Sequence, residues 1–181
     1  EDLEMADIIR LMVGRELTNQ FPPKTNKPGD VYLQVEHLTG MYNQLRDVSF
    51  TARRGEILGL AGLDSSGRTE TLESIFGIRT RKDGIISLDG QPCFNRNAGE
   101  SIKNGFALLT EERRATGIFG GLSIRENTVI SSLKRHLRFG LYLSEKTQRE
   151  DTQHYIDAMR TKTPSQETKI RSLSGGNQQK V

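Results

Sequence analysis

The sequence has one cysteine, no tryptophan and three histidines among its 181 residues. Cys93 alone cannot form an internal disulfide, which fits a reducing compartment. The histidines are too scattered to predict a metal site. The sequence also lacks a run of 18 apolar residues, and its start, EDLEMADIIR, is acidic where a secretory signal would be basic. Neither a membrane-spanning helix nor a signal peptide is therefore predicted.

The sequence also lacks a large excess of charge of either sign. The 26 lysine and arginine residues nearly balance the 23 aspartate and glutamate residues, which leaves a net charge of +3 and no basic block. Nucleic acid is therefore not an expected partner, because phosphate backbones are bound by concentrated positive charge. Apolar residues make up only 34%, but 18 glycines bring the composition near the range of ordinary globular domains.

The beginning of the chain predicts a helix followed by a linker. Residues 2–17 place Leu3, Ile8 and Met12 at helical spacing, whereas three of the five prolines fall between Phe21 and Asp30. We therefore expect residues 1–20 to be the tail of a preceding domain and residues 21–30 to be a linker. The main domain should occupy residues 31–181.

The first half of this domain is rich in predicted strands. We expect strands at 31–38 and 48–52, a helix from Thr69 to Phe76 that Gly77 ends, a hairpin region bracketed by Asp83-Gly84 and Asp89-Gly90, and a short buried strand at 106–109. The segment from Glu56 to Ala61 is apolar on both faces, which is typical of a central strand.

The second half is predicted to be helical. The sequence Ser123-Ile-Arg-Glu126 matches a capping box and should open a helix of roughly a dozen residues. A second helix is expected from Glu145 to Arg160, and Pro164 ends this part.

One glycine-rich motif, Gly62-Leu-Asp-Ser-Ser-Gly67-Arg68-Thr69, lies between the apolar segment and the first helix. In a phosphate-binding loop of this spacing, backbone N–H groups and the helix N-terminus hold phosphates, a lysine reaches the terminal phosphate, and the hydroxyl binds magnesium. Thr69 keeps the hydroxyl, but Arg68 replaces the lysine and Asp64 would repel an anion. The alternative is an ordinary strand-to-helix turn without a ligand.

A second motif, Leu173-Ser174-Gly175-Gly176-Asn177-Gln178-Gln179-Lys180, places a hydroxyl and two glycines where a helix begins. Bare backbone amides at such a position can approach an anion closely. Alone, a Ser-Gly-Gly sequence is only a flexible loop. With a phosphate-loop motif upstream, it favours a functional role.

These motifs resemble a known family. LSGGNQQKV resembles the signature motif of ATP-binding cassette (ABC) ATPases, and GLAGLDSSGRTETLESIFG resembles the degenerate Walker A of the second cassette in tandem-cassette monosaccharide importers. FALLTEERRATGIF is similar to their Q-loop region, and IIRLMVGREL to the end of the first cassette. DTQHYIDAMRTKTP and the proline-rich linker resemble the importers of galactose and methyl galactoside within this family.

The resemblance implies an α/β fold: a truncated P-loop ABC-type ATPase domain with a small antiparallel β portion and an inserted helical segment at about 113–172. It implies ATP and Mg²⁺ as cofactors. Implied phosphate-loop residues are Gly62, Ser66, Gly67, Arg68 and Thr69, with Thr69 also on the metal and Tyr42 near the adenine. Ser174, Gly175 and Gly176 would contact the γ-phosphate of ATP held by the preceding cassette, and Glu111 stands at the Q-loop glutamine position.

The resemblance further implies a peripheral protein on the cytoplasmic face of the inner membrane. Its partners would be a membrane permease, a periplasmic sugar-binding protein and the preceding cassette of the same chain. Arg68, Ser65 and Glu111 depart from the family pattern, and each weakens this domain's own nucleotide site. The catalytic Asp-Glu strand and the switch histidine are expected beyond Val181, so this chain alone should not hydrolyse ATP.

Two alternatives remain open from the residues. The domain could be a non-catalytic module that only transmits motion to a membrane partner. A P-loop GTPase or nucleic-acid ATPase is disfavoured, because the signature motif has no role there.

Overall fold

The structure is a computed structural model that describes residues 7–8, 23–42 and 45–181. Of the helix predicted over residues 2–17, only Asp7 and Ile8 are described, and both are helical; the rest lies outside the described residues. The chain divides into two compact units, residues 1–106 and 107–181. Among the described residues, no helix is long and apolar enough to cross a membrane.

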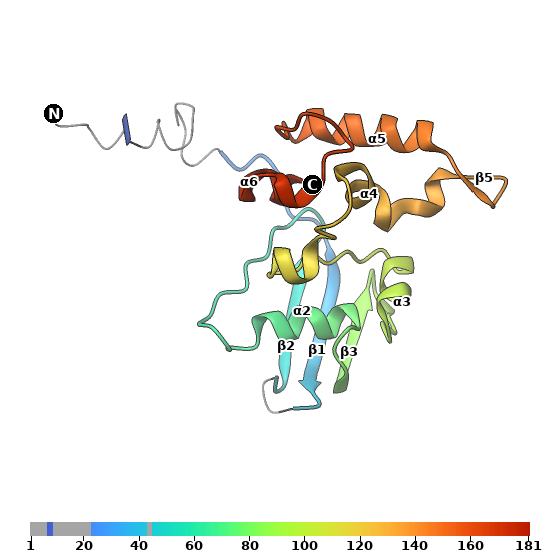
Figure 1. Ribbon diagram of the computed structural model, residues 1–181. Helices are drawn as coiled ribbons and strands as arrows, with labels where there is room; N and C mark the ends of the chain where they lie inside the picture. Colours follow the sequence, from blue (N-terminus) through green and yellow to red (C-terminus); the bar gives the residue numbers. More distant parts are fainter. Residues whose placement is uncertain (1–6, 9–22, 43–44) are drawn as a thin grey trace. The chain divides into compact units, whose positions relative to one another are not determined.

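The first unit is built on an antiparallel sheet (Figure 1). Its strands are β1 (Val31–Gly40), β2 (Val48–Arg53), β3 (Arg81–Leu88) and β4 (Gln91–Pro92), in the order β2-β1-β3-β4. In the centre of β1, Val35 pairs with Phe50 on β2 and with Ile86 on β3. The strands predicted at 31–38 and 48–52 are therefore confirmed.

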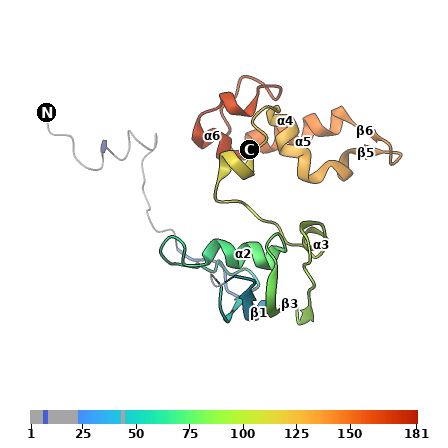
Figure 2. The same cartoon turned by 60° about the horizontal axis from the view of Figure 1, so that its bottom comes forward.

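One helix, α2 (Arg68–Phe76), packs across a face of this sheet (Figure 2). The core beneath it consists of Val35, Leu38, Leu45, Ile75 and Ile86, each at most 5% exposed. The predicted end of the helix at Gly77 is confirmed, since this residue adopts a φ of 77° and its N–H returns to the carbonyl of Ser74.

Polar side chains from the following segment hold the carboxyl end of α2. Asn95 Nδ2 donates to the Ile75 carbonyl at 2.8 Å, and Ser101 Oγ donates to the Phe76 carbonyl at 2.6 Å. Asn95 and Ser101 are both buried, and Ser101 lies on α3 (Ala98–Lys103). These bonds satisfy carbonyls that the helix itself cannot pair.

Two predicted strands are wrong. Residues 56–61 and 106–109 form no strand, and Ile57 and Leu109 are 94% and 98% exposed. An apolar segment becomes a central strand only when neighbours pair with both of its edges, and no described strand pairs with either segment. Apolar composition alone could not supply those neighbours.

The hairpin prediction is half right. Asp89-Gly90 forms the turn between β3 and β4, with positive φ at both residues. Asp83-Gly84, however, lies inside β3, where the pairing with β1 shifts between Glu36 and Thr39. Gly84 has a φ of 116° and passes close to the backbone of Leu38, so this glycine serves a β-bulge rather than a turn.

The second unit is mainly helical, as predicted. Its elements are a π-helical turn (Arg113–Gly117), α4 (Ile124–Val129), a 3-10 segment (Ile130–His136), the hairpin β5 (Leu137–Arg138) and β6 (Tyr142–Leu143), α5 (Glu145–Ala158), a 3-10 turn (Ile170–Ser172) and α6 (Gly175–Lys180). The predicted capping box is confirmed: Ser123 Oγ accepts from the Glu126 N–H, and the Glu126 carboxylate accepts from the Ser123 N–H. The Ser123 hydroxyl also donates to the Glu126 carboxylate, and the bonds from the Ser123 N–H and hydroxyl lower the pKa of Glu126 below its usual value.

The helix that Ser123 opens is shorter than predicted. It is α-helical for six residues and then tightens into the 3-10 segment, in which Ser132 has non-helical backbone angles. Arg125 ties α4 to Gln148 of α5 at 2.9 Å and to Glu167 at 3.0 Å, and the latter hydrogen bond raises the pKa of Arg125.

Replacing Gly84 with alanine should destabilise the first unit more than replacing Gly90 does. Both glycines have positive φ, but an added Cβ at Gly84 would lie 2.6 Å from Leu38 Cα, whereas at Gly90 it would meet nothing within 4 Å. We expect Gly90→Ala to cost about 1 kcal/mol and Gly84→Ala at least about 1 kcal/mol more. Urea unfolding of the two variants measures this difference, and equal costs would contradict the bulge interpretation.

Candidate nucleotide-binding site

The segment from Gly62 to Gly67 forms a tight loop directly before α2. The Ser66 N–H donates to the Leu63 carbonyl at 3.1 Å, and Ser65 and Gly67 both have positive φ. Gly67 is the N-cap of α2 and offers no side-chain cap. The loop therefore leads bare backbone into the N-terminus of a nine-residue helix, where an anion is favoured.

Glycine at the first position of this loop allows a close approach to the Ser66 side chain. A Cβ on Gly62 would collide with Ser66 Oγ, so the chain folds back on itself there. Thr71 Oγ1 donates to the Gly67 carbonyl at 2.6 Å and fixes the other end of the loop on α2. The loop is therefore compact and is held at both ends by contacts among its own residues and α2.

The charges of the loop partly compensate one another. Arg68 Nη2 lies 3.5 Å from Asp64 Oδ1, four residues earlier in the loop, and the two side chains are 38% and 103% exposed. The pair is too exposed to stabilise the fold appreciably. Arg68 occupies the position of the lysine in a phosphate-binding loop. Because Asp64 already pairs with Arg68, the arginine would be shared between Asp64 and a bound anion. Thr69 lies in the first turn of α2, half-buried.

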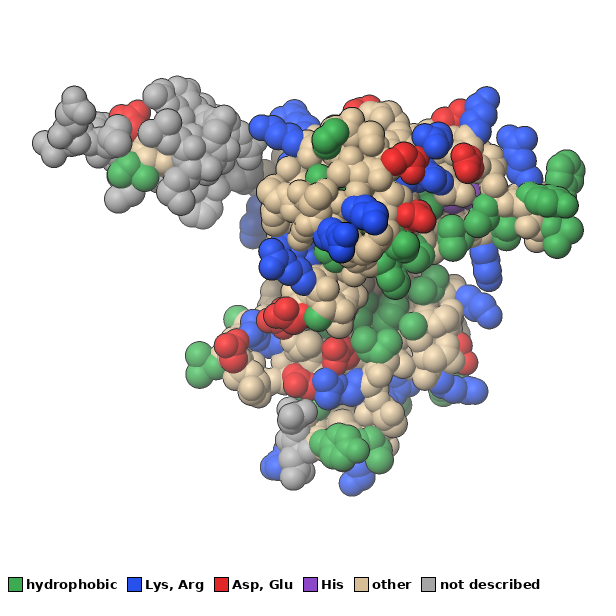
Figure 3. All heavy atoms as spheres, viewed as in Figure 1, with side chains coloured by type: hydrophobic (Ala, Val, Ile, Leu, Met, Phe, Trp, Pro, Cys, Tyr) green, Lys and Arg blue, Asp and Glu red, His purple; other side chains and the backbone are tan. Residues whose placement is uncertain are grey.

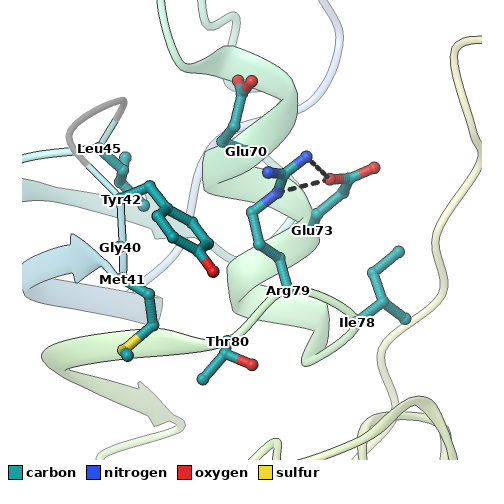
Figure 4. Close-up of a pocket in the computed structure, with 9 residues that line it drawn as sticks. All are labelled: Gly40, Met41, Tyr42, Leu45, Glu70, Glu73, Ile78, Arg79 and Thr80. Carbon is teal, nitrogen blue, oxygen red and sulfur yellow. Dashed lines mark hydrogen bonds and ion pairs between the residues drawn. The ribbon is translucent and has the colours of Figure 1, made fainter.

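Tyr42 lies at a pocket of about 440 Å³ beside α2. Its ring extends from the end of β1 toward Arg79 and Thr80, and Glu70 and Glu73 line the helix side (Figure 4). Glu73 is engaged by Arg79 at 2.7 Å, and Tyr42 itself is 79% exposed. An exposed aromatic face can stack on a planar base, but the pocket at Tyr42 includes no residue of the loop before α2.

The signature motif forms a structured turn in the second unit. Ser174 is the N-cap of α6, and its Oγ accepts from Asn177 Nδ2 at 3.1 Å. Gln178, only 4% exposed, donates through Nε2 to the carbonyls of Ile170 and Leu173 at 3.2 and 3.0 Å. These bonds fix the backbone on which the two glycines sit.

Arg113 makes a contact with this motif that the sequence did not predict. Its Nη1 donates to the Gly175 carbonyl at 2.8 Å, although 62 residues separate the two. A Cβ on Gly175 would lie 3.2 Å from Arg113 Nη2, whereas one on Gly176 would meet nothing within 4 Å. Gly175 thus packs on an arginine, and Gly176 leaves its backbone open. The only signal in the sequence was the charged run Glu111 to Arg114, which is more often a solvated turn.

Glu111 is exposed and lies on a pocket of about 530 Å³ whose far wall includes Gln178 and Gln179 of α6. The structure therefore brings the Q-loop-like segment and the signature helix together within the second unit. The phosphate loop and Tyr42 belong to the first unit. Among the residues the structure describes, no group of three or more His, Cys, Asp or Glu side chains could hold a metal ion.

A tight loop at the start of a helix beside an antiparallel sheet, and a Ser-Gly-Gly turn in a helical unit, are the two features expected of an ATP-binding cassette. The ABC transporter family model matches residues 45–181, and the chain belongs to this family.

Curated relatives are similar over almost the whole chain. A protein of Mannheimia succiniciproducens named galactose/methyl galactoside import ATP-binding protein MglA is 54% identical over 98% of this chain, and its namesake in Vibrio vulnificus is 56% identical over 99%. The chain spans 35% and 36% of the length of these two relatives.

Solved structures agree on the fold. An ATP-binding cassette of an ABC transporter matches 84% of this chain and 62% of its own, with a TM-score of 0.67 and 16% identity. A dimeric cassette in a post-hydrolysis state bound to ADP and Pi matches 82% and 66%, with a TM-score of 0.65 and 19% identity.

Removing the Arg113 guanidinium should loosen the signature turn. We expect Arg113→Ala to raise amide hydrogen exchange at residues 173–178 about tenfold, because a charge-assisted hydrogen bond to the Gly175 carbonyl is lost. The matched control is Arg114→Ala, which removes an exposed neighbouring arginine and should leave exchange there unchanged. Equal exchange in both variants would show that Arg113 does not hold the turn.

Proposed function

We propose that this chain is part of the second nucleotide-binding cassette of a tandem-cassette protein that couples ATP hydrolysis to import of galactose or methyl galactoside. The observation that carries the proposal is identity of 54–56% to the import ATP-binding proteins over 98–99% of the chain. The identity extends through the chain's beginning, which we assign to the end of the preceding cassette.

The nucleotide of this cassette would be ATP with Mg²⁺. Its phosphates would bind the cradle formed by the loop before α2, its adenine would stack on Tyr42, and the Thr69 hydroxyl would be a metal ligand. When bound, ATP supplies the phosphoanhydride bond to be cleaved. The residues we assign to phosphate binding are Gly62, Ser66, Gly67, Arg68 and Thr69. The tight loop, the uncapped start of α2 and the position of Tyr42 support this assignment.

The signature turn would serve the opposite nucleotide site. Ser174, Gly175 and Gly176 would donate hydrogen bonds to the γ-phosphate of ATP held by the preceding cassette, and Glu111 would take the Q-loop position. The open backbone at Gly176 and the bracing of Gly175 by Arg113 support this role. Donors that are held in place before the reaction stabilise charge in the transition state most effectively.

The two sites should then differ in strength. Here the signature turn is intact, whereas the Arg68–Asp64 pair weakens the chain's own cradle. We propose that catalysis occurs where this signature turn meets the preceding cassette's loop, and that the site at Arg68 mainly retains nucleotide. The partners would be a membrane permease and a periplasmic sugar-binding protein, with the protein attached to the cytoplasmic face of the inner membrane. No role for nucleic acid is proposed.

Nucleotide binding by this chain should depend on the ring of Tyr42. We expect Tyr42→Ala to weaken binding of a fluorescent ATP analogue about tenfold and Tyr42→Phe to have little effect, because stacking needs the ring and not the hydroxyl. Tyr155→Ala, which removes an aromatic ring 47% exposed in the second unit, is the control. If Tyr42→Ala binds as the unaltered chain does, adenine lies elsewhere.

In the complete import protein reconstituted with its permease, Gly176→Asp should lower ATP turnover at least about tenfold more than Arg68→Ala. The aspartate removes close backbone approach and places negative charge against the γ-phosphate, whereas Arg68→Ala affects only the weaker site. Steady-state phosphate release measures both variants. The opposite ranking would mean that the cradle before α2 is the catalytic one, and the asymmetric arrangement would be abandoned.

A further inference from the structure

The β5–β6 hairpin projects from the second unit on a firmly held base. Leu137 pairs with Leu143, and Arg138 pairs with Tyr142. Below these pairs, the Ser144 N–H donates to the His136 carbonyl at 2.8 Å. His136 is 2% exposed, with Nδ1 3.1 Å from Thr147 Oγ1 at the start of α5. The base of the hairpin is therefore held in place, and the tip beyond it is largely exposed.

The tip presents large apolar side chains to solvent. Phe139 is 93% exposed, Leu141 79% and Tyr142 70%. Phe139 and Gly140 both have positive φ, and the Leu141 N–H closes the turn on the Arg138 carbonyl at 3.2 Å. A bulky aromatic residue at positive φ is strained, and turns of this kind normally carry Asn, Asp or Gly. Neither the local conformation nor packing within the chain accounts for this phenylalanine.

The charges within residues 130–144 are all of one sign, although Glu145 follows directly and Asp151 lies 3.7 Å from His136 at the base of the hairpin. Residues 130–144 contain Lys134, Arg135 and Arg138 and no acidic residue, in a chain whose overall charge is only +3. All three cationic side chains belong to exposed residues. Figure 3 shows apolar side chains projecting at the place of this hairpin, with lysine and arginine side chains next to them.

We propose that this hairpin tip, residues 138–142, docks on the surface of a bilayer that contains anionic phospholipids. The Phe139, Leu141 and Tyr142 side chains would enter the interfacial region, where aromatic and apolar groups are favoured. Arg138, with Lys134 and Arg135 behind it, would bind the headgroup phosphates. A bilayer fits better than a protein groove because the patch combines a projecting apolar tip with positive charges that have no ion pair within the described part of the chain. The contact does not depend on which sugar is imported.

Three cations and a small apolar tip give weak, reversible attachment that falls with salt. Such a contact would orient the protein at the membrane, while the proposed permease would provide the main attachment.

The test is flotation of the 181-residue chain with vesicles. We expect binding to vesicles of phosphatidylcholine with about one-third phosphatidylglycerol, little binding to pure phosphatidylcholine, and release by high salt. The double variant Phe139→Ser/Leu141→Ser should lower the bound fraction at least about fivefold. Arg135→Gln/Arg138→Gln should lower it similarly and flatten its salt dependence.

The control is Phe94→Ser/Ile102→Ser. It removes an aromatic and an aliphatic side chain that are 64% and 57% exposed in the first unit, with the Arg96 guanidinium 5.9 Å from the Phe94 ring. Its binding should match that of the unaltered chain. Thermal unfolding followed by circular dichroism verifies that every variant folds.

Unchanged binding of both hairpin variants would overturn the proposal, as would equal loss in the control. Equal binding to neutral vesicles would overturn it too. So would hairpin-dependent capture of a membrane protein without binding to lipid vesicles, which would make the surface a protein contact.

Discussion

The packing of α2 on β1 is the interaction on which the nucleotide side of this molecule depends. Ile75 of the helix meets Val35 and Leu38 of the strand in a core that excludes water. The cradle lies at the start of this helix, and Tyr42 follows the end of this strand. Apolar burial therefore positions both the loop before α2 and the segment that carries Tyr42. The loop and Tyr42 are each positioned through the core and need not contact each other.

The signature turn in the second unit is held by hydrogen bonds from polar side chains rather than by apolar packing. Gln178 is buried against carbonyls of the preceding turn, Asn177 reaches Ser174, and Arg113 reaches Gly175. Directional bonds suit this task, because two adjacent glycines have no side chains to pack and much conformational freedom to lose. The same arrangement leaves Gly176 open while Gly175 is braced. The turn, which would present its backbone amides to a phosphate, is thus held in place by hydrogen bonds from Arg113, Asn177 and Gln178.

The departures of the phosphate loop from its family pattern have a structural counterpart. Asp64 and Arg68 are four residues apart and pair with each other, so their charges partly compensate. The loop keeps its shape, since Gly62, Ser66 and Gly67 retain their roles in the fold-back. The loop differs from the family pattern in the charge that it would present to a bound anion. This difference motivates the assignment of the stronger site to the signature turn.

The sequence by itself determined the features that depend on neighbouring residues. The cradle at 62–69, the end of α2 at Gly77, the Ser123 capping box and the Ser-Gly-Gly turn each follow from chemistry within a few positions of the chain. The roles of Gly62, Ser66, Gly67, Arg68, Thr69, Tyr42, Glu111, Ser174, Gly175 and Gly176 in binding ATP remain predictions. Only the tertiary structure decided that 56–61 lacks a described strand partner, that Gly84 serves a bulge, that Arg113 holds Gly175, and that the hairpin tip is exposed. Each of these depends on which distant segment lies opposite, and local composition and periodicity do not specify that partner.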